Sequence, residues 1–387
     1  MVTLNYQTVL NAIGGLLFKI SETRYEYIYP KQLDNGTTKM IVRELGKRII
    51  DFGTSPPTIG SETTIDIATP SGLNNPIAFF RGKLGYDFDN DAILMFVGEW
   101  DGSSNVPRST TVKLLSIARD FSDVTVEIDD VLSLVKNAAS DVDLIKLYAH
   151  AWRLGNLGVA TIGAYAAGSE RSVILKDTGT GWSAEVHSER YNYVQELVEP
   201  FWDENTFMGF LTEGHGTNSL WIKTDGSVQA GAPGGTFTTS PIYDPINNRI
   251  LWFEWGGEIS SGTQHIWTAP PSTPFTGTDI TPSGSLTDAE GNTVNLQACG
   301  KIPGFIFSDK QNNKVILGIN FGGLPAGVWR VLQLDLDTMS VDGLFTLKDG
   351  TDTIYTHVYL RAIDPSAKKL IPVPIVNVYD TALGWYV

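Results

Sequence analysis

The sequence predicts an all-β fold in which about seven small antiparallel sheets follow one another along the chain. Three observations lead to this prediction. The chain has 387 residues, which is too long for one ordinary compact core. Its composition, with 42% hydrophobic and only 18% charged residues and 39 glycines, is typical of a globular, turn-rich protein. A strand–turn–strand unit also recurs, so we expect several small repeated cores.

In the recurring unit an apolar strand runs into a tight polar turn, and a second apolar strand follows. Asp and Asn suit these turns because their side chains bond the following backbone, and Pro suits them because it presets φ. The clearest copies are Tyr86–Asn90, Phe201–Asn205, Tyr243–Asn248, Phe307–Asn313 and Ile363–Pro365. Weaker copies lie at Ser21–Thr23 and Arg153–Asn156. One landmark from each turn, in chain order, gives Glu22, Asp87, Arg153, Asp203, Asp244, Asp309 and Asp364.

A third strand with Trp or β-branched residues follows each hairpin. The predicted third strands are Thr38–Arg43, Thr111–Ile117, Ser172–Lys176, Leu220–Lys223, Ile266–Thr268, Trp329–Leu334 and Trp385–Val387. Fourth strands are expected in six units, among them Arg48–Phe52, Val124–Ile128 and Ala184–His187. The seventh unit lacks one, and we expect Val2–Val9 to supply it, because this pairing removes an exposed edge and closes the ring.

With this organisation the chain resembles the β-propeller superfamily, and the resemblance covers nearly all of it. It implies a single domain, a seven-bladed β-propeller of four-stranded antiparallel blades closed by the N-terminal strand at residues 1–10. The expected blades are residues 14–53, 77–128, 143–188, 193–233, 237–283, 294–347 and 353–387. The alternative is a pair of β-sandwiches divided between Ile128 and Leu144. The Gly-His…Trp-Asp signature of WD40 repeats and the recurring double glycine of Kelch repeats do not occur.

One fragment, Asp177–Trp182, is similar to the Asp box of sialidase-like propellers, D-x-G-x-x-W. It falls between a predicted third and fourth strand, as that box does. Leu175 takes the place of the usual Ser or Thr, and only Thr224–Gly226 partly repeats the motif. A tight turn with an aromatic plug is the alternative to a functional motif here.

Charge and residue usage exclude several kinds of site. The net charge of −15, without a Lys/Arg stripe, argues against nucleic-acid binding. Cys299 is the only cysteine, so neither an intrachain disulfide nor a cysteine metal cluster can form. The five histidines lack metal-ligand spacing, and no phosphate-binding motif occurs, so we expect neither metal nor cofactor. No signal peptide and no membrane insertion are expected either.

The two ends of the blades are expected to differ. The short Asp/Asn turns gather at one end, whereas longer loops gather at the other. Aromatic side chains beside carboxylates suit carbohydrate stacking or a protein contact. The candidate binding residues on these longer loops are Trp100, Glu213, His215, Trp255, Glu258, Tyr379 and Asp380. For each tryptophan, capping of its own blade is the alternative.

No residue is predicted to be catalytic. Glu213 and Glu258 are conceivable partners for glycoside hydrolysis, which needs two carboxyl groups roughly 5–9.5 Å apart. A sialidase also needs an arginine cluster, and the arginines here do not occupy matching positions in the units.

The sequence therefore favours a non-catalytic binding or assembly protein. Its composition is similar to that of bacteriophage tail and other virion proteins, so the expected partners are other subunits of a particle or a host surface glycan. The expected location is the virion if the chain is phage-encoded, and otherwise the cytoplasm. A propeller glycoside hydrolase or lyase and a stand-alone cytoplasmic scaffold remain as alternatives.

Overall fold

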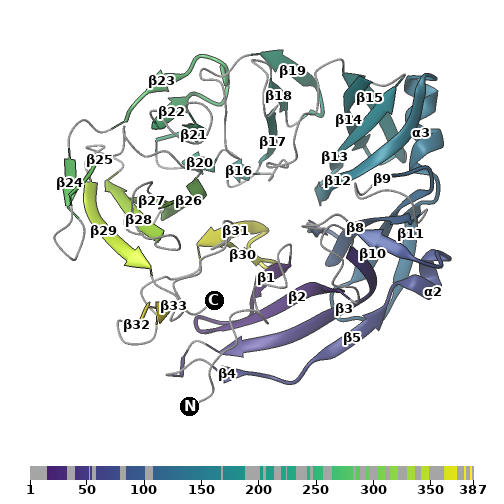
Figure 1. Cartoon of the computed structure of the whole chain (residues 1–387), viewed down its shortest axis with the longest axis horizontal. Helices are drawn as coiled ribbons and strands as arrows, with labels where there is room; N and C mark the ends of the chain where they lie inside the picture. The colour runs from purple at the N-terminus through teal and green to yellow at the C-terminus, as the bar shows by residue number, and fades with distance from the viewer. Residues whose placement is uncertain are drawn as a thin grey trace. The chain divides into compact units, whose positions relative to one another are not determined.

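The computed structural model gives the strands over most of the chain (Figure 1). It describes residues 15–32, 40–51, 53–54, 58–78, 84–100, 108–166, 169–187, 201–203, 206–212, 219–223, 225–231, 242–244, 247–255, 264–281, 285–287, 293–295, 303–309, 314–320, 329–335, 341–347, 361–372, 379–380 and 384–385. Contacts divide the chain into two compact units. The first comprises Met1–Val198, Thr224–Ser227 and Ala362–Lys369, and the second comprises Glu199–Lys223, Val228–Arg361 and Leu370–Val387.

The first unit contains two well-defined antiparallel sheets of consecutive strands. One has the order β7–β8–β10–β11 and the other β12–β13–β14–β15. Their strands are β7 (Gly85–Asp87), β8 (Ala92–Glu99), β10 (Val112–Ala118), β11 (Val124–Ile128), β12 (Val142–Leu154), β13 (Leu157–Ala166), β14 (Ser169–Asp177) and β15 (Trp182–His187). Each sheet is a four-stranded meander, as the repeat predicts.

The remaining elements of this unit include a further antiparallel sheet, in which the chain from β1 to β5 pairs in the order β1–β2–β3–β5, and several shorter strands and helices. They are β1 (Leu16–Lys19), β2 (Arg24–Gln32), β3 (Met40–Asp51), β4 (Thr58–Ile59), β5 (Thr63–Asp66), β6 (Pro76–Ala78), β9 (Arg108–Ser109), β30 (Arg361–Asp364) and the helices α2 (Ala68–Ser71) and α3 (Val131–Ala138). β6 pairs with both β3 and β8, and β9 pairs with β12. Short strands thus tie neighbouring sheets together.

The first strands of successive sheets lie side by side and parallel. Asp87 of β7 is in register with Arg153 of β12, and Phe18 of β1 is in register with Ile363 of β30. The approach at β7 is close, because a Cβ on Gly85 would lie 1.6 Å from the carbonyl oxygen of Ala151. Glycine is therefore required at position 85.

The second unit contains three further four-stranded antiparallel sheets, β16–β17–β18–β19, β20–β21–β22–β23 and β26–β27–β28–β29. Their first strands again follow one another, because β20 contacts both β16 and β26. Two hairpins, β24–β25 and β32–β33, complete it. The strands are β16 (Phe201–Asp203), β17 (Thr206–Thr212), β18 (Ser219–Ile222), β19 (Val228–Gly231), β20 (Ile242–Asp244), β21 (Arg249–Trp255), β22 (Gln264–Ala269), β23 (Thr278–Asp279), β24 (Ser285–Thr287), β25 (Thr293–Asn295), β26 (Pro303–Asp309), β27 (Lys314–Asn320), β28 (Trp329–Asp335), β29 (Val341–Leu347), β31 (Lys369–Pro372), β32 (Tyr379–Asp380) and β33 (Gly384–Trp385).

Consecutive four-stranded meanders with neighbouring first strands are the blades of an all-β propeller. The predicted fold class is therefore confirmed. The number of blades, the single-domain division and the blade bounds stay predictions. The proposed closing strand, Val2–Val9, lies outside the described residues.

One local prediction is wrong. The segment Arg48–Phe52 is not a separate fourth strand, because β3 runs without a break from Met40 to Asp51. β3 continues through this region because it pairs with both β2 and β5, and a Cβ on Gly46 would lie 2.7 Å from the ring of Tyr29. Helix α3 was also not predicted, although Asp130 caps it by accepting a hydrogen bond from the backbone of Ser133.

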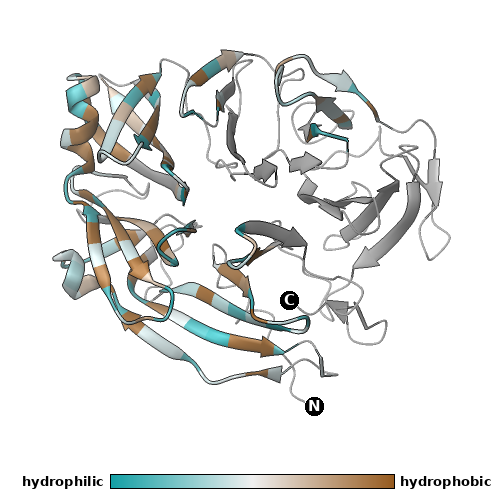
Figure 2. Cartoon of the chain, turned by 180° about the vertical axis from the view of Figure 1, so that it is seen from behind, coloured by the Kyte–Doolittle hydropathy of each residue, from teal (hydrophilic) through white to brown (hydrophobic). Residues whose placement is uncertain are grey.

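The core of the first unit consists of buried hydrophobic side chains from its strands and from α3. Almost all of β8 is buried, and α3 buries Val131, Leu132 and Val135. Figure 2 shows runs of hydrophobic residues along these strands, interrupted by hydrophilic turns. Among the described residues, none of the helices has the length and apolar character needed to cross a membrane.

Candidate functional site

The structure describes only part of the predicted binding surface. Trp100 directly follows β8 and is half-buried, and Trp255 is the last residue of β21. Tyr379 and Asp380 were expected in a loop, but they form β32, which pairs with Gly384 and Trp385 in a short hairpin. Glu213, His215 and Glu258 lie outside the described residues. Whether these seven residues meet on one surface stays a prediction.

The loop after β8 is held at both of its ends. The carboxylate of Glu99 accepts hydrogen bonds from the backbone of Asn74 at 2.8 Å and of Asn75 at 2.9 Å. The backbone of Trp100 donates to the carbonyl of Asn75 at 3.1 Å. At the far end, the hydroxyl of Ser109 donates to the carbonyl of Glu99 at 2.8 Å. The first residues of this loop are therefore fixed to Asn74 and Asn75 of the same chain, and its two ends are fixed to each other.

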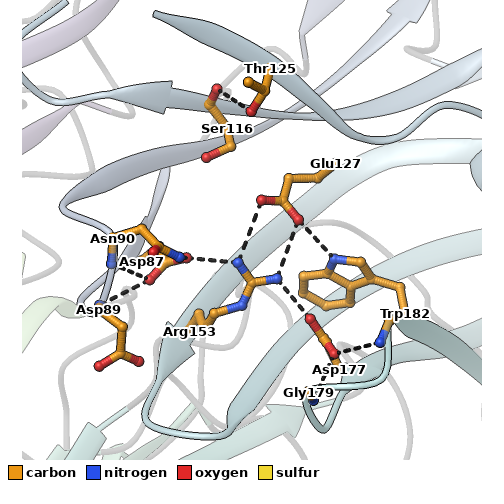
Figure 3. Close-up of polar contacts among 11 residues, drawn as sticks. Asp87, Asp89, Asn90, Ser116, Thr125, Glu127, Arg153, Asp177, Gly179 and Trp182 are labelled. Carbon is orange, nitrogen blue, oxygen red and sulfur yellow. Dashed lines mark hydrogen bonds and ion pairs between the residues drawn. The ribbon is translucent and has the colours of Figure 1, made fainter.

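The best-defined polar cluster lies at the other end of the blades, where the short turns are (Figure 3). We call it the Arg153 junction, and it comprises Arg153, Asp87, Glu127, Asp177 and Trp182. Arg153 lies near the end of β12, just before the turn to β13. Asp87 and Glu127 come from the first and last strands of the preceding blade, and Asp177 and Trp182 flank the β14–β15 turn.

Arg153 binds three carboxylates at once. Its Nη1 donates to Asp87 Oδ2 at 2.7 Å, its Nη2 donates to Asp177 Oδ2 at 2.8 Å, and Nη2 also lies 3.3 Å from Glu127 Oε2. The guanidinium stands over the ring of Trp182, with the carbon 5.4 Å from the ring centroid. The side chain of Asp87 is 0% exposed and that of Arg153 is 13% exposed. One cation therefore ties two blades together through largely buried ion pairs.

Local sequence places these carboxylates. Asp87 accepts hydrogen bonds from the backbone of Asp89 and Asn90, which closes the β7–β8 turn as predicted from Asx chemistry. Asp177 does the same for Gly179 and Gly181, whose φ angles are 89° and 101°. The Asp-box-like fragment is therefore a tight turn whose tryptophan packs on an arginine.

The electrostatics of the junction favour a permanent cation. Burial alone would lower the pKa of Arg153, but hydrogen bonds to Glu127 and Asp87 and the charges of both carboxylates outweigh it, and the pKa is raised. Asp87, Glu127 and Asp177 each form an ion pair with this one arginine. The arrangement suits structural cross-linking, because all three carboxylates are already engaged by one fixed cation.

A second cluster, the Arg119 junction, comprises Arg119, Asp91, Glu26 and Lys47. Arg119 Nε donates to Asp91 Oδ1 at 2.6 Å within its own blade, and Nη1 donates to Glu26 Oε2 at 2.7 Å on β2. Lys47 Nζ lies 3.6 Å from Glu26 Oε1. The hydroxyl of Tyr86 donates to Asp91 as well. This junction also joins two sheets through an arginine.

The sequence already contained one signal for the Arg153 junction. The turn landmarks align Arg153 with Asp87, and the structure places these two residues in register on adjacent first strands. Because the arginines were examined for a substrate-binding cluster, this pairing was missed. In the part of the chain that the structure describes, no group of His, Cys, Asp and Glu residues is arranged to hold a metal ion.

No protein-family model matches the chain, and no curated protein matches it. Among solved structures it is similar to TolB from Acinetobacter baumannii, with 11% identity, 88% of this chain and 69% of that chain covered, and a TM-score of 0.35. It is similar to the Dos1 propeller, with 10% identity, coverage of 90% and 72%, and a TM-score of 0.43. A chain of a nidogen/laminin complex gives 11% identity, coverage of 88% and 95%, and a TM-score of 0.33.

Likeness at these identities and TM-scores says nothing about what this chain binds or catalyses. The propeller assignment rests on the blades of the chain itself.

Proposed function

We propose that this propeller is a non-catalytic binding protein that contacts a protein partner through the longer loops of its blades. One observation carries the proposal: the loop that follows Trp100 has a rigid stem, fixed by Glu99 and Ser109, on a framework of blades tied by ion pairs. Loops positioned by a rigid scaffold are the usual site of recognition. At the turn end, the described carboxylates Asp87, Asp177 and Asp364 bond backbone or arginine groups, which suits a structural role for this end.

The partner class follows from composition and charge. A net charge of −15 suits a protein surface that carries basic residues. Aromatic residues on the predicted loop surface, with Trp100 and Trp255 first among them, suit the anchors of a protein interface. We infer that the partner is another subunit of a larger particle, such as a virion appendage. A host glycan is the competing ligand for the same residues.

The test separates binding from folding. Sedimentation of the native particle from its source should place the chain in an assembly much larger than one 42.3 kDa chain. Recombinant full-length protein should re-associate with particles depleted of it, and Trp100→Ala and Trp255→Ala should each weaken this association by roughly 1–3 kcal/mol. The melting temperature of both variants should change little.

The matched control is Asp364→Asn in a turn at the opposite end, which should lower the melting temperature and leave association unchanged. Binding of the free chain to a glycan panel, with no association with particles, would assign the loops to carbohydrate. Hydrolysis of simple aryl glycosides that Glu213→Gln or Glu258→Gln abolishes would refute a non-catalytic role.

A further inference from the structure

One arginine of the first unit has different partners from the other arginine side chains described there. The others each have a carboxylate oxygen within 4.0 Å, and they are Arg24, Arg48, Arg119, Arg153 and Arg171. Arg43 on β3 instead donates from Nη2 to the carbonyl oxygen of Asn74 at 2.6 Å and to Oδ1 of Asn75 at 3.3 Å. Among the described residues, no carboxylate lies within 4.0 Å of its guanidinium. Arg43 is therefore held by neutral groups, and its charge forms no ion pair within this part of the chain.

Two carboxylates on segments that adjoin Arg43 are engaged by backbone groups. Asp66 of β5 accepts hydrogen bonds of 2.9 and 3.3 Å from two backbone N–H groups at the start of α2. Glu99 accepts hydrogen bonds from the backbone of Asn74 and Asn75. The side chain of Arg43 is exposed to solvent, and a guanidinium offers parallel N–H donors that match the two oxygens of a carboxylate. Arg43 is therefore suited to bind a carboxylate from another molecule.

Asn75 connects Arg43 to the loop that begins at Trp100. Its side chain accepts from Arg43, and its carbonyl oxygen accepts from the backbone of Trp100 at 3.1 Å. The strand that follows it, β6, pairs with both β3 and β8, so the segment is held between the strands that carry these two residues. Trp and Arg are among the residue types that contribute most to the binding energy of protein interfaces. Here one of each flanks a single fixed asparagine.

The charge of the whole chain and the charge of Arg43 have different consequences for binding. A net charge of −15 attracts a basic partner at long range, but it does not fix how the two surfaces align. A single oriented cation does, because it disfavours every alignment that places a basic group against it. We propose that Arg43 is a specificity-determining contact beside Trp100 and that it binds a carboxylate on the surface of the protein partner. This inference rests on the proposed function and names the chemical group that the partner presents.

The first measurement compares how full-length variants associate with particles depleted of the chain. Arg43→Gln removes the charge and should weaken association about tenfold. Arg43→Lys keeps the charge but loses the planar fork, so it should weaken association less. The matched control is Arg24→Gln, which removes the same charge from an exposed arginine of the same sheet and should associate as wild type does. The melting temperature of Arg43→Gln should change little, because the arginine is exposed and its described hydrogen bonds go to neutral groups.

The second measurement identifies the group that Arg43 binds. Treatment of the depleted particles with a carbodiimide and glycinamide converts their surface carboxylates into neutral amides. On these particles the tenfold ratio between wild type and Arg43→Gln should fall to about one, because the carboxylate is lost from the other side of the contact. An unchanged ratio would show that Arg43 only holds Asn74 and Asn75 in place, and the carboxylate contact would be wrong while the proposed function stands. If wild-type protein does not associate with untreated particles, the proposed function is wrong as well.

Discussion

The Arg153 and Arg119 junctions join sheets with the same chemistry but different exposure. In both, one arginine binds carboxylates from two sheets. Asp87 of the Arg153 junction is 0% exposed, whereas Asp91 of the Arg119 junction is 53% exposed. Glu26 also keeps Lys47 as a second cation, at 3.6 Å. If Arg119 is lost, water can therefore solvate Asp91 and Lys47 can still pair with Glu26. If Arg153 is lost, the buried Asp87 has neither form of compensation.

The difference shows that the number of ion pairs in a junction does not predict how much that junction stabilises the protein. A carboxylate without its cation costs free energy in proportion to how little water reaches it. Asp87, at the end of β7, is the least exposed charged side chain in these two junctions, so the stability of its blade contact depends strongly on the arginine beside it.

The largest effect is expected for Arg153→Met. The substitution keeps most of the aliphatic side chain and leaves Asp87 buried without a counter-charge, although Asp87 keeps its backbone hydrogen bonds. Urea denaturation should show a loss of about 3 kcal/mol in the free energy of unfolding. Arg153→Lys should lose less, because it keeps the charge. A loss below about 1 kcal/mol for Arg153→Met would show that Asp87 is not isolated from water.

A smaller loss is expected for Arg119→Met. Asp91 is exposed and Glu26 retains Lys47, so the free energy of unfolding should fall by about 1–2 kcal/mol. The double variant with Lys47→Met should lose more than the sum of the two single variants, because Glu26 then has neither cation. A loss equal to that of Arg153→Met would contradict the ranking by exposure.

A loss of about 1 kcal/mol is expected for Trp182→Leu. The substitution removes the ring face over which Arg153 stands, and with it the cation–π attraction. Trp182→Phe is the matched control and should retain most of the stability, since a ring face remains. Equal losses for the two variants would assign the effect to packing alone.

The smallest effect concerns pH and distinguishes the exposed junction. Burial would raise the pKa of Asp91, but hydrogen bonds from Arg119 and Tyr86 outweigh it and lower the pKa. A lowered folded-state pKa contributes stability above the unfolded value of about 3.9, and this stability is lost as the pH falls through the folded-state pKa. Wild type should therefore exceed Asp91→Asn in melting temperature at pH 7, and the gap should shrink below about pH 4. In an Arg119→Met background the gap should be small at every pH.

Sequence reasoning predicted the turns because their interactions are local. Asp87 and Asp364 each bond backbone groups two and three residues further on, so residue type and order are sufficient. The same holds for Asp177, whose turn needs two glycines at positive φ. The strands that these turns connect could therefore be located, as could the antiparallel meander.

Contacts between distant segments were harder to predict. Two separate strands, Thr38–Arg43 and Arg48–Phe52, were predicted, but pairing with β2 and β5 makes β3 continuous from Met40 to Asp51. Tyr379 and Asp380 resembled loop residues, but pairing with Gly384 and Trp385 makes them a strand. In each case the deciding partner lies on another strand, and the pattern within one segment does not identify it.

The sequence by itself determined the repeat, the turn residues and hence the blades of the propeller, because hydrophobic period and Asx chemistry act within a few residues. Tertiary structure decided which charges meet. The twelve arginines look alike in the sequence, yet Arg153 became the tie between two blades because parallel first strands bring it into register with Asp87. That register depends on how whole sheets pack, and the buried carboxylate gives the contact its free energy only when the packing has excluded water.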